Sequence, residues 1–171
     1  DLLRDTLPGA LIVGDSTQAV YAGNMGFAAA RPGGYFNSAT GYGTLGYGLP
    51  AAVGAALADG RPVLALSGDG GLQFSLAELA SAVEAKAPVI LLLYDNQGYG
   101  EIKSAMIAQN VPPLGVDILT PDLPAIARAC GWQTVEADTA AGMREAVEGA
   151  ARSGACTMIR YTDRLREGLG R

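Results

Sequence analysis

The chain has 171 residues, of which 49% are hydrophobic, and its formal net charge is −5. This length fits one domain, and a negative charge without any basic run disfavours a nucleic acid or an anionic membrane as partner. The sequence contains no histidine, which excludes Ser-His hydrolases, Cys-His proteases and zinc sites built from histidine. The longest apolar runs are far shorter than the ~20 residues that a membrane span needs.

Two further features concern the setting of the chain. Cys130 and Cys156 form no CxxC pair, which predicts small buried thiols in a reducing, cytoplasmic compartment. The sequence begins with Asp1 in place of methionine, almost directly before its first apolar run. We therefore expect a single domain excised from a larger enzyme, or a separate subunit of one.

Short apolar runs alternate with segments of helical pattern along the whole chain. The predicted strands are Ala10–Val13, Tyr35–Ser38, Pro62–Leu66, Pro88–Tyr94, Trp132–Glu136 and Cys156–Tyr161. The predicted helices are Asp1–Leu7, Tyr47–Asp59, one beginning at a Ser75–Glu78 capping box, one after Gly98, Pro121–Ala129 with Thr120 as its N-cap, and Thr139–Arg152. Residues 107–119 read as irregular, and 163–171 as a linker remnant or frayed helix. The alternation predicts an α/β fold, a doubly wound, three-layer α/β/α arrangement around a mainly parallel sheet of about six strands.

The first predicted strand ends in Gly14-Asp15-Ser16. A GDS sequence after a strand resembles the nucleophile turn of serine esterases, but the chain has no histidine to activate Ser16. A plain strand-end turn with a helix N-cap explains the same residues equally well.

The segment Gly41–Gly46 matches the dinucleotide pattern G-x-G-x-x-G, with a helix after it and Asp69 roughly 20 residues further on. Three features count against a Rossmann site. The strand before the glycines is short and polar, Pro50 lies early in the helix, and Asp69 is embedded in a GDGG sequence that suits phosphate better than ribose. Binding of NAD(P) stays an alternative function.

Polar residues follow two apolar strands that we expect to be neighbours. Asp69 comes after the first of them and Asn96 after the second. Because loops after parallel strands lie at the same edge of the sheet, these side chains are candidates to meet. A carboxylate, an amide oxygen and backbone carbonyls suit Mg²⁺, and the glycines around Asp69 allow a phosphate to approach backbone N–H groups.

The spacing of these residues resembles the signature of thiamine-diphosphate-dependent enzymes. GDG ends at Gly70, and 25 residues that finish in an apolar strand separate it from Asn96. The resemblance implies that Asp69 and Asn96 bind Mg²⁺ through their side chains and that Gly98 binds it through its carbonyl. The family usually has Asn where this chain has Asp95, a position that is not a ligand.

A second segment, GTLGYGLPAAVGAALA, resembles the part of these enzymes that holds the cofactor. The resemblance implies that Leu45 wedges under thiamine diphosphate and that backbone groups around Gly43 and Leu45 bind its aminopyrimidine. Taken alone, Leu45 would be an ordinary core leucine, and Tyr99 could contact the cofactor or only cover the loop. The resemblance implies these cofactor-binding residues: Thr17, Gln18, Gly43, Thr44, Leu45, Gly68, Asp69, Gly70, Gly71, Asn96, Gly98 and Tyr99.

The resemblance spans roughly residues 10–161 and implies the C-terminal, diphosphate-binding domain of an acetolactate synthase-like enzyme or 2-oxo acid decarboxylase. It also implies a pyrimidine-binding domain of the same enzyme, in a homodimer or tetramer, which supplies the activating glutamate. We expect no catalytic residue in this chain and little activity from it alone. Glu101 is a possible contact to a small 2-oxo acid, or a solvated carboxylate in the first turn of a helix. A non-catalytic module of the same fold stays an alternative.

Overall fold

The computed structural model describes residues 2–168, so the predictions for Asp1 and for 169–171 lie outside it. Six parallel strands form one sheet in the order β2-β1-β3-β4-β6-β5. The strands are β1 (Leu11–Gly14), β2 (Tyr35–Asn37), β3 (Val63–Gly68), β4 (Val89–Tyr94), β5 (Gln133–Glu136) and β6 (Thr157–Tyr161). The predicted parallel sheet is confirmed.

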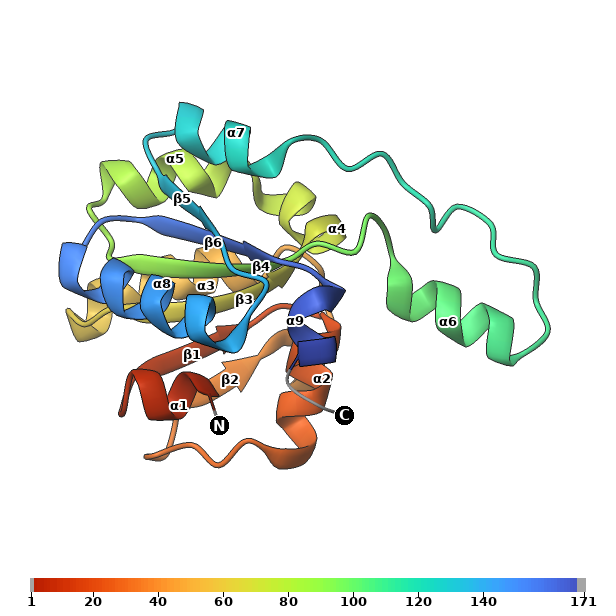
Figure 1. Cartoon of the computed structure of the whole chain (residues 1–171), viewed down its shortest axis with the longest axis horizontal. Coiled ribbons are helices and arrows are strands. Elements are labelled where there is room, and N and C mark those ends of the chain that lie inside the picture. The colour runs from red at the N-terminus through yellow and green to blue at the C-terminus, as the bar shows by residue number, and fades with distance from the viewer. Residues whose placement is uncertain (1, 169–171) are drawn as a thin grey trace.

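Helices cover both faces of the sheet, which confirms the three-layer arrangement (Figure 1). One face carries α3 (Gly48–Asp59), α5 (Ala77–Glu84) and α7 (Leu123–Ala129). The other carries α1 (Leu2–Thr6), α2 (Gln18–Gly26), α8 (Ala140–Ser153) and α9 (Asp163–Gly168). Of these, α2 had no predicted bounds, although a helix N-cap after Gly14-Asp15-Ser16 implied a helix there.

Strands β1 and β4 are built from apolar residues and glycine because successive side chains of a strand point to opposite faces, and both faces are covered. In β4, Leu91 packs with the first group of helices and Leu92 with the second. On the first face, the Trp132 indole Nε1 donates to the Leu79 carbonyl at 2.7 Å. This bond joins α5 to the start of β5.

Strand register brings three turns to one edge of the sheet. Gly14 pairs with Leu66, and Gly68 pairs with Tyr94. The residues that follow, Asp15, Asp69 and Asp95, therefore all lie at the carboxyl edge. Directly after β3 the chain forms the short helix α4 (Asp69–Leu72) and a 3₁₀ turn, η2 (Gln73–Ser75). A second 3₁₀ turn, η1 (Ser38–Thr40), follows β2.

The segment 99–119 forms an arm that projects away from the sheet (Figure 1). It contains α6 (Gly100–Ala108), which has no buried residue. The base of the arm is closed by a bond from the Tyr99 N–H to the Val116 carbonyl at 2.9 Å and by an ion pair between Lys103 and Asp117 at 2.7 Å. Both ends of the arm therefore return to the carboxyl edge.

The predicted capping box is wrong. The helical turn begins at Asp69, and Leu76, the residue before α5, already has helical φ and ψ. An N-cap residue needs extended backbone, so the Ser75 side chain has no helix end to cap. Its buried hydroxyl has no partner among the described residues.

The N-cap predicted at Thr120 is also wrong. Asp122 caps α7 by accepting from the Ala125 N–H at 2.8 Å, and the helix begins at Leu123. Thr120 is thereby free for another contact, described below. Both cysteines are free thiols, Cys156 buried and Cys130 half-buried. Over residues 2–168, no helix combines the length and apolar character required to cross a membrane.

Candidate functional site

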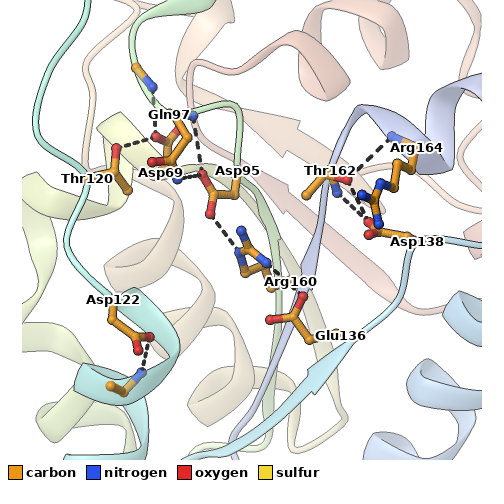
Figure 2. A network of polar contacts seen from close by, with 12 residues as sticks. Asp69, Asp95, Gln97, Thr120, Asp122, Glu136, Asp138, Arg160, Thr162 and Arg164 are labelled. Carbon is orange, nitrogen blue, oxygen red and sulfur yellow. Dashed lines mark hydrogen bonds and ion pairs between the residues drawn. The ribbon is translucent and has the colours of Figure 1, made fainter.

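Asp69 is the centre of the carboxyl edge. It is only 1% exposed. Its Oδ2 accepts two hydrogen bonds, from the Gly98 N–H at 2.9 Å and from the Thr120 hydroxyl at 2.8 Å (Figure 2). The hydroxyl that the sequence assigned to a helix cap instead holds this carboxylate. Oδ1 is left to face Asn96.

The side-chain amide of Asn96 points one of its two polar atoms at a pair of oxygens. That atom lies 3.0 Å from Asp69 Oδ1 and 2.9 Å from the Gly98 carbonyl oxygen. If it is the amide nitrogen, it donates to both. If it is the amide oxygen, three oxygens face one another, and a cation between them removes their repulsion. The structure thus brings together the three residues predicted as ligands, in a set that could hold a hard cation.

Backbone geometry explains how Asn96 and Gly98 reach the same place. Gln97, between them, has a φ of 60°, which is uncommon for a residue other than glycine. Gly98 has a φ of 154°, and a Cβ there would lie 2.6 Å from the Val116 carbonyl oxygen. The turn therefore needs glycine at this position, both for its φ and for the close approach of the arm.

Electrostatics at Asp69 favour a positive ligand. Burial is the main cause that raises the pKa of the Asp69 carboxyl, and the nearby charge of Asp95 adds to it. Hydrogen bonds from Thr120, Gly70 and Gly98 act in the opposite direction. A cation beside Oδ1 would favour the ionised form that this environment disfavours.

Asp95, where the family usually has Asn, is paired with an arginine. Its Oδ2 accepts from the Arg160 Nε at 2.6 Å, and Arg160 Nη1 donates to Glu136 at 2.7 Å (Figure 2). Its Oδ1 accepts from the Gln97 N–H at 3.2 Å and the Gln97 Nε2 at 2.6 Å. The negative charge of Asp95 is thus balanced by Arg160 on β6.

Asp15 is a site residue that sequence reasoning missed. It is fully buried, and its Oδ1 accepts from the Ser16 N–H at 2.7 Å. Its Oδ2 accepts from the N–H groups of Gly46 and Gly48, at 2.9 and 3.2 Å. Burial raises the pKa of Asp15 although these donors lower it. A charged residue directly after a buried strand was the available signal, but two of its three partners, Gly46 and Gly48, lie 31 and 33 positions away.

Asp15 fixes the glycine segment that follows the edge strand β2. Gly43, with a φ of 67°, donates its N–H to the Ser38 carbonyl at 2.9 Å. Leu45 is half-buried and Thr44 is exposed. A 3₁₀ turn and a loop separate β2 from α3, which begins only at Gly48. In a Rossmann site the strand leads through the glycines directly into the helix, so this arrangement does not favour that alternative.

The remaining predicted residues border the same edge. The buried Thr17 packs against Gly68, where a Cβ would lie 3.1 Å from the Thr17 Oγ1. The ring of Tyr99 occupies the space beside Gly70, where a Cβ would come within 2.6 Å of it. Tyr99 therefore covers the GDG turn.

Gln18 and Glu101 meet across 83 positions of sequence. The Gln18 Nε2 donates to a Glu101 carboxylate oxygen at 3.1 Å. Gln18 is the first residue of α2, and Glu101 lies in the first turn of α6. Glu101 is exposed and lies beside a predicted diphosphate contact. Ser16, by contrast, pairs only with the Ser38 hydroxyl, at 2.9 Å, among the contacts of its side chain in the described chain.

Comparison with known proteins identifies the family of this chain. Residues 13–161 match the family described as thiamine pyrophosphate enzyme, C-terminal TPP binding domain. The chain is 42% identical over 134 residues to the probable 2-ketoarginine decarboxylase AruI of Pseudomonas aeruginosa, covering 77% of this chain and 24% of that protein. It is 37% identical over 143 residues to the benzoylformate decarboxylase of the same organism, covering 82% and 26%.

A solved structure shows the same fold. The thiamine diphosphate-dependent 4-hydroxybenzoylformate decarboxylase of Rhodococcus jostii RHA1 superposes with a TM-score of 0.83 at 32% identity, over 93% of this chain and 30% of that one. The chain spans about a quarter of the length of the two curated relatives. The chain belongs to the thiamine pyrophosphate enzyme family, and it corresponds to the C-terminal TPP-binding domain of that family.

Proposed function

We propose that this chain binds Mg²⁺ and thiamine diphosphate together and forms the diphosphate-binding part of a 2-oxo acid decarboxylase or acetolactate synthase-like enzyme. The observation that carries the proposal is the convergence of Asp69 Oδ1, the Asn96 amide and the Gly98 carbonyl, with contacts of 3.0 and 2.9 Å. Family membership supports the cofactor. The metal is our inference from the ligand set.

The donor set fits Mg²⁺. Mg²⁺ takes oxygen ligands and keeps several waters or phosphate oxygens, so one carboxylate, one amide and one carbonyl suffice from the protein. Within residues 2–168, no three His, Cys, Asp or Glu side chains gather as a metal cluster, so the proposed protein ligands are one carboxylate, one amide and one backbone carbonyl. The pair of donors on Asp69 Oδ2 would keep Oδ1 directed at the ion.

Thiamine diphosphate supplies, when bound, a centre that stabilises a carbanion next to a former carbonyl group. The residues of this chain would bind and orient it. Thr17, Gln18 and the glycines after β3 would contact the diphosphate. Leu45 and the Gly43 backbone lie on the loop that Asp15 fixes by accepting a hydrogen bond from the Gly46 N–H. The activating glutamate and much of the pocket would come from a pyrimidine-binding domain and a second subunit.

The chain by itself would bind the cofactor weakly and turn over little 2-oxo acid. Calorimetric titration of thiamine diphosphate into the chain, with Mg²⁺ and then with chelator, tests the site. We expect binding that disappears with chelator and in Asp69→Ala. Metal-independent binding of NAD(P) would contradict the proposal, and so would a failure of both the chain and the complete enzyme that contains it to bind thiamine diphosphate. Full turnover by the chain alone would contradict the proposed dependence on a second domain.

For the substrate, we propose a 2-oxo acid with a cationic tail. The relative of 42% identity is named for 2-ketoarginine, whose guanidinium is cationic. Glu101 offers an exposed carboxylate beside Gln18, in the first turn of α6. A carboxylate there would pair with the tail while the carbonyl end of the substrate faces the cofactor.

The substrate proposal is tested in the complete enzyme by Glu101→Gln, with kcat/KM measured for a guanidinium-bearing and a neutral 2-oxo acid. We expect the preference for the cationic substrate to fall by about 10-fold or more, which corresponds to the ~1.5–3 kcal/mol of a charged hydrogen bond. Asp117→Asn is the matched control, because Asp117 is also an exposed carboxylate of the arm and pairs with Lys103 instead. An unchanged preference in Glu101→Gln would overturn this assignment.

A further inference from the structure

Arg160 joins two acidic residues at the carboxyl edge. It lies in β6, and it contacts Asp95 at 2.6 Å and Glu136 at 2.7 Å. The Asp95 side chain is only 6% exposed, while that of Glu136 is 61% exposed. A buried carboxylate is strongly unfavourable without a partner, so the contact to Asp95 is the one that matters energetically.

The second oxygen of Asp95 holds the turn between two of the proposed metal ligands. Asp95 Oδ1 accepts from both the N–H and the Nε2 of Gln97. Gln97 has the left-handed φ of 60°, a conformation that costs free energy in a residue other than glycine. These two hydrogen bonds offset that cost, and Gln97 stands between Asn96 and Gly98.

We propose that Arg160 is a positioning residue for the cation site, a role that rests on the proposed function. By fixing one oxygen of Asp95, it keeps the other oxygen on Gln97 (Figure 2). In this way it keeps the Asn96 amide and the Gly98 carbonyl directed at the ion. Arg160 would not touch the ion, because Asp95 and Gln97 lie between them in this series of contacts. It acts through Asp95.

The effect of removing Arg160 separates positioning from simple electrostatics. Loss of a positive charge near Asp69 and Asp95 would by itself make the site more negative and tighten cation binding. Loss of positioning does the opposite, because an unpaired Asp95 carboxylate turns toward water and releases Gln97. Changes to residues that orient metal ligands weaken metal affinity by about 10- to 100-fold.

The test is titration of Mn²⁺ into the full chain with saturating thiamine diphosphate, with free and bound ion measured by electron paramagnetic resonance. We expect Arg160→Met to weaken Mn²⁺ binding about 10- to 100-fold and Arg160→Lys, which keeps the charge but not the forked donor, to weaken it less. The double variant Asp95→Asn/Arg160→Met should regain near wild-type affinity. The amide that this variant carries at position 95 has no charge to balance and still offers an oxygen to Gln97.

Arg128→Met is the matched control. Arg128 and Arg160 line the same surface pocket of about 450 Å³, and both variants lose one positive charge. The Arg128 guanidinium donates to the Thr134 hydroxyl at 2.9 Å, on the strand beside β6, and so has a partner outside the Asp95–Gln97 turn. We expect its Mn²⁺ affinity to equal that of the wild type or to rise slightly through the lost charge. Equal or tighter binding in Arg160→Met, or failure of Asp95→Asn to restore it, would overturn the proposal.

A second measurement does not depend on the ion. In the metal-free chain, hydrogen exchange of the Gln97 backbone N–H should quicken in Arg160→Met and slow again in the double variant, while urea unfolding confirms that each variant is folded. Unchanged exchange would also overturn the positioning role. If the wild-type chain and the complete enzyme that contains it both fail to bind Mn²⁺ with the cofactor, the proposed function is wrong, whatever the exchange of Gln97 shows.

Discussion

Two aspartates, Asp15 and Asp69, hold equivalent places in this sheet. Each follows a glycine at the carboxyl end of a parallel strand, β1 for the first and β3 for the second. Each is essentially buried, with 0% and 1% of its surface exposed. Burial raises the pKa of both carboxyls.

The two differ in how their oxygens are satisfied. Both oxygens of Asp15 accept from backbone N–H groups of the chain, at Ser16, Gly46 and Gly48. Oδ2 of Asp69 accepts from the Gly98 N–H and the Thr120 hydroxyl, whereas Oδ1 faces the Asn96 amide. The Asp15 carboxylate, with both oxygens bonded to backbone N–H groups, fixes a loop, whereas we propose that Oδ1 of Asp69 binds an ion. The same Gly-Asp sequence at a strand end therefore has different roles, because the donors that remote segments bring to the two carboxylates differ.

The largest expected difference between Asp15 and Asp69 is in their contributions to the free energy of unfolding. Asp15→Ala would leave three N–H groups without their acceptor, one of them on the buried Gly48. We expect the free energy of unfolding to fall by about 3 kcal/mol, since each unsatisfied buried donor costs about 1–3 kcal/mol. In the metal-free chain, Asp69→Ala should cost less than about 1 kcal/mol, because Gly98 and Thr120 are only half-buried and water can replace the lost acceptor. Urea unfolding measures both, and equal losses would contradict the distinction.

Substitution of Thr120 tests whether its hydroxyl orients the Asp69 carboxylate for ion binding. Thr120→Val keeps the shape of the side chain and removes the hydroxyl that holds Oδ2 at 2.8 Å. We expect the affinity for Mg²⁺ with thiamine diphosphate to fall about 10- to 100-fold, as for other residues that orient metal ligands.

Thr120→Ser keeps the hydroxyl and should bind like the wild type in the same calorimetric titration. Thr134→Val, on β5, removes a hydroxyl that pairs with Arg128 and serves as control. Equal affinity in the valine and serine variants at position 120 would show that the hydroxyl does not orient Asp69.

The smallest effect concerns pH. Because the pKa of Asp15 is higher in the folded chain than its ordinary value of 3.8, the folded state holds this proton more tightly. The stability that this contributes is present below pH 3.8 and is lost as pH rises through the raised pKa. Relative to Asp15→Asn, the free energy of unfolding of the wild type should fall over that window. Urea unfolding from about pH 3.5 upward measures the difference, and a constant or rising difference would contradict it.

Local sequence was enough for the fold and for part of the site. Apolar runs alternating with helices determined a parallel sheet, and a parallel sheet brings the ends of its strands together, so Asp69 and Asn96 could be expected to meet. Position 98 needs glycine for a reason that only the structure shows, a φ of 154° and the close approach of Val116. The roles of Leu45 and of the other cofactor residues stay predictions.

Partners from distant segments could not be derived in this way. Thr120 looked like a helix cap because its neighbours fit that pattern, yet its hydroxyl reaches Asp69, 51 positions earlier. Asp15 and Asp95 take their donors from positions 33 and 65 residues away, at Gly48 and Arg160. Periodicity determines which face of an element is buried, but the partner of a buried polar group depends on which segments the fold brings to the same edge. Only the tertiary structure decided those pairings.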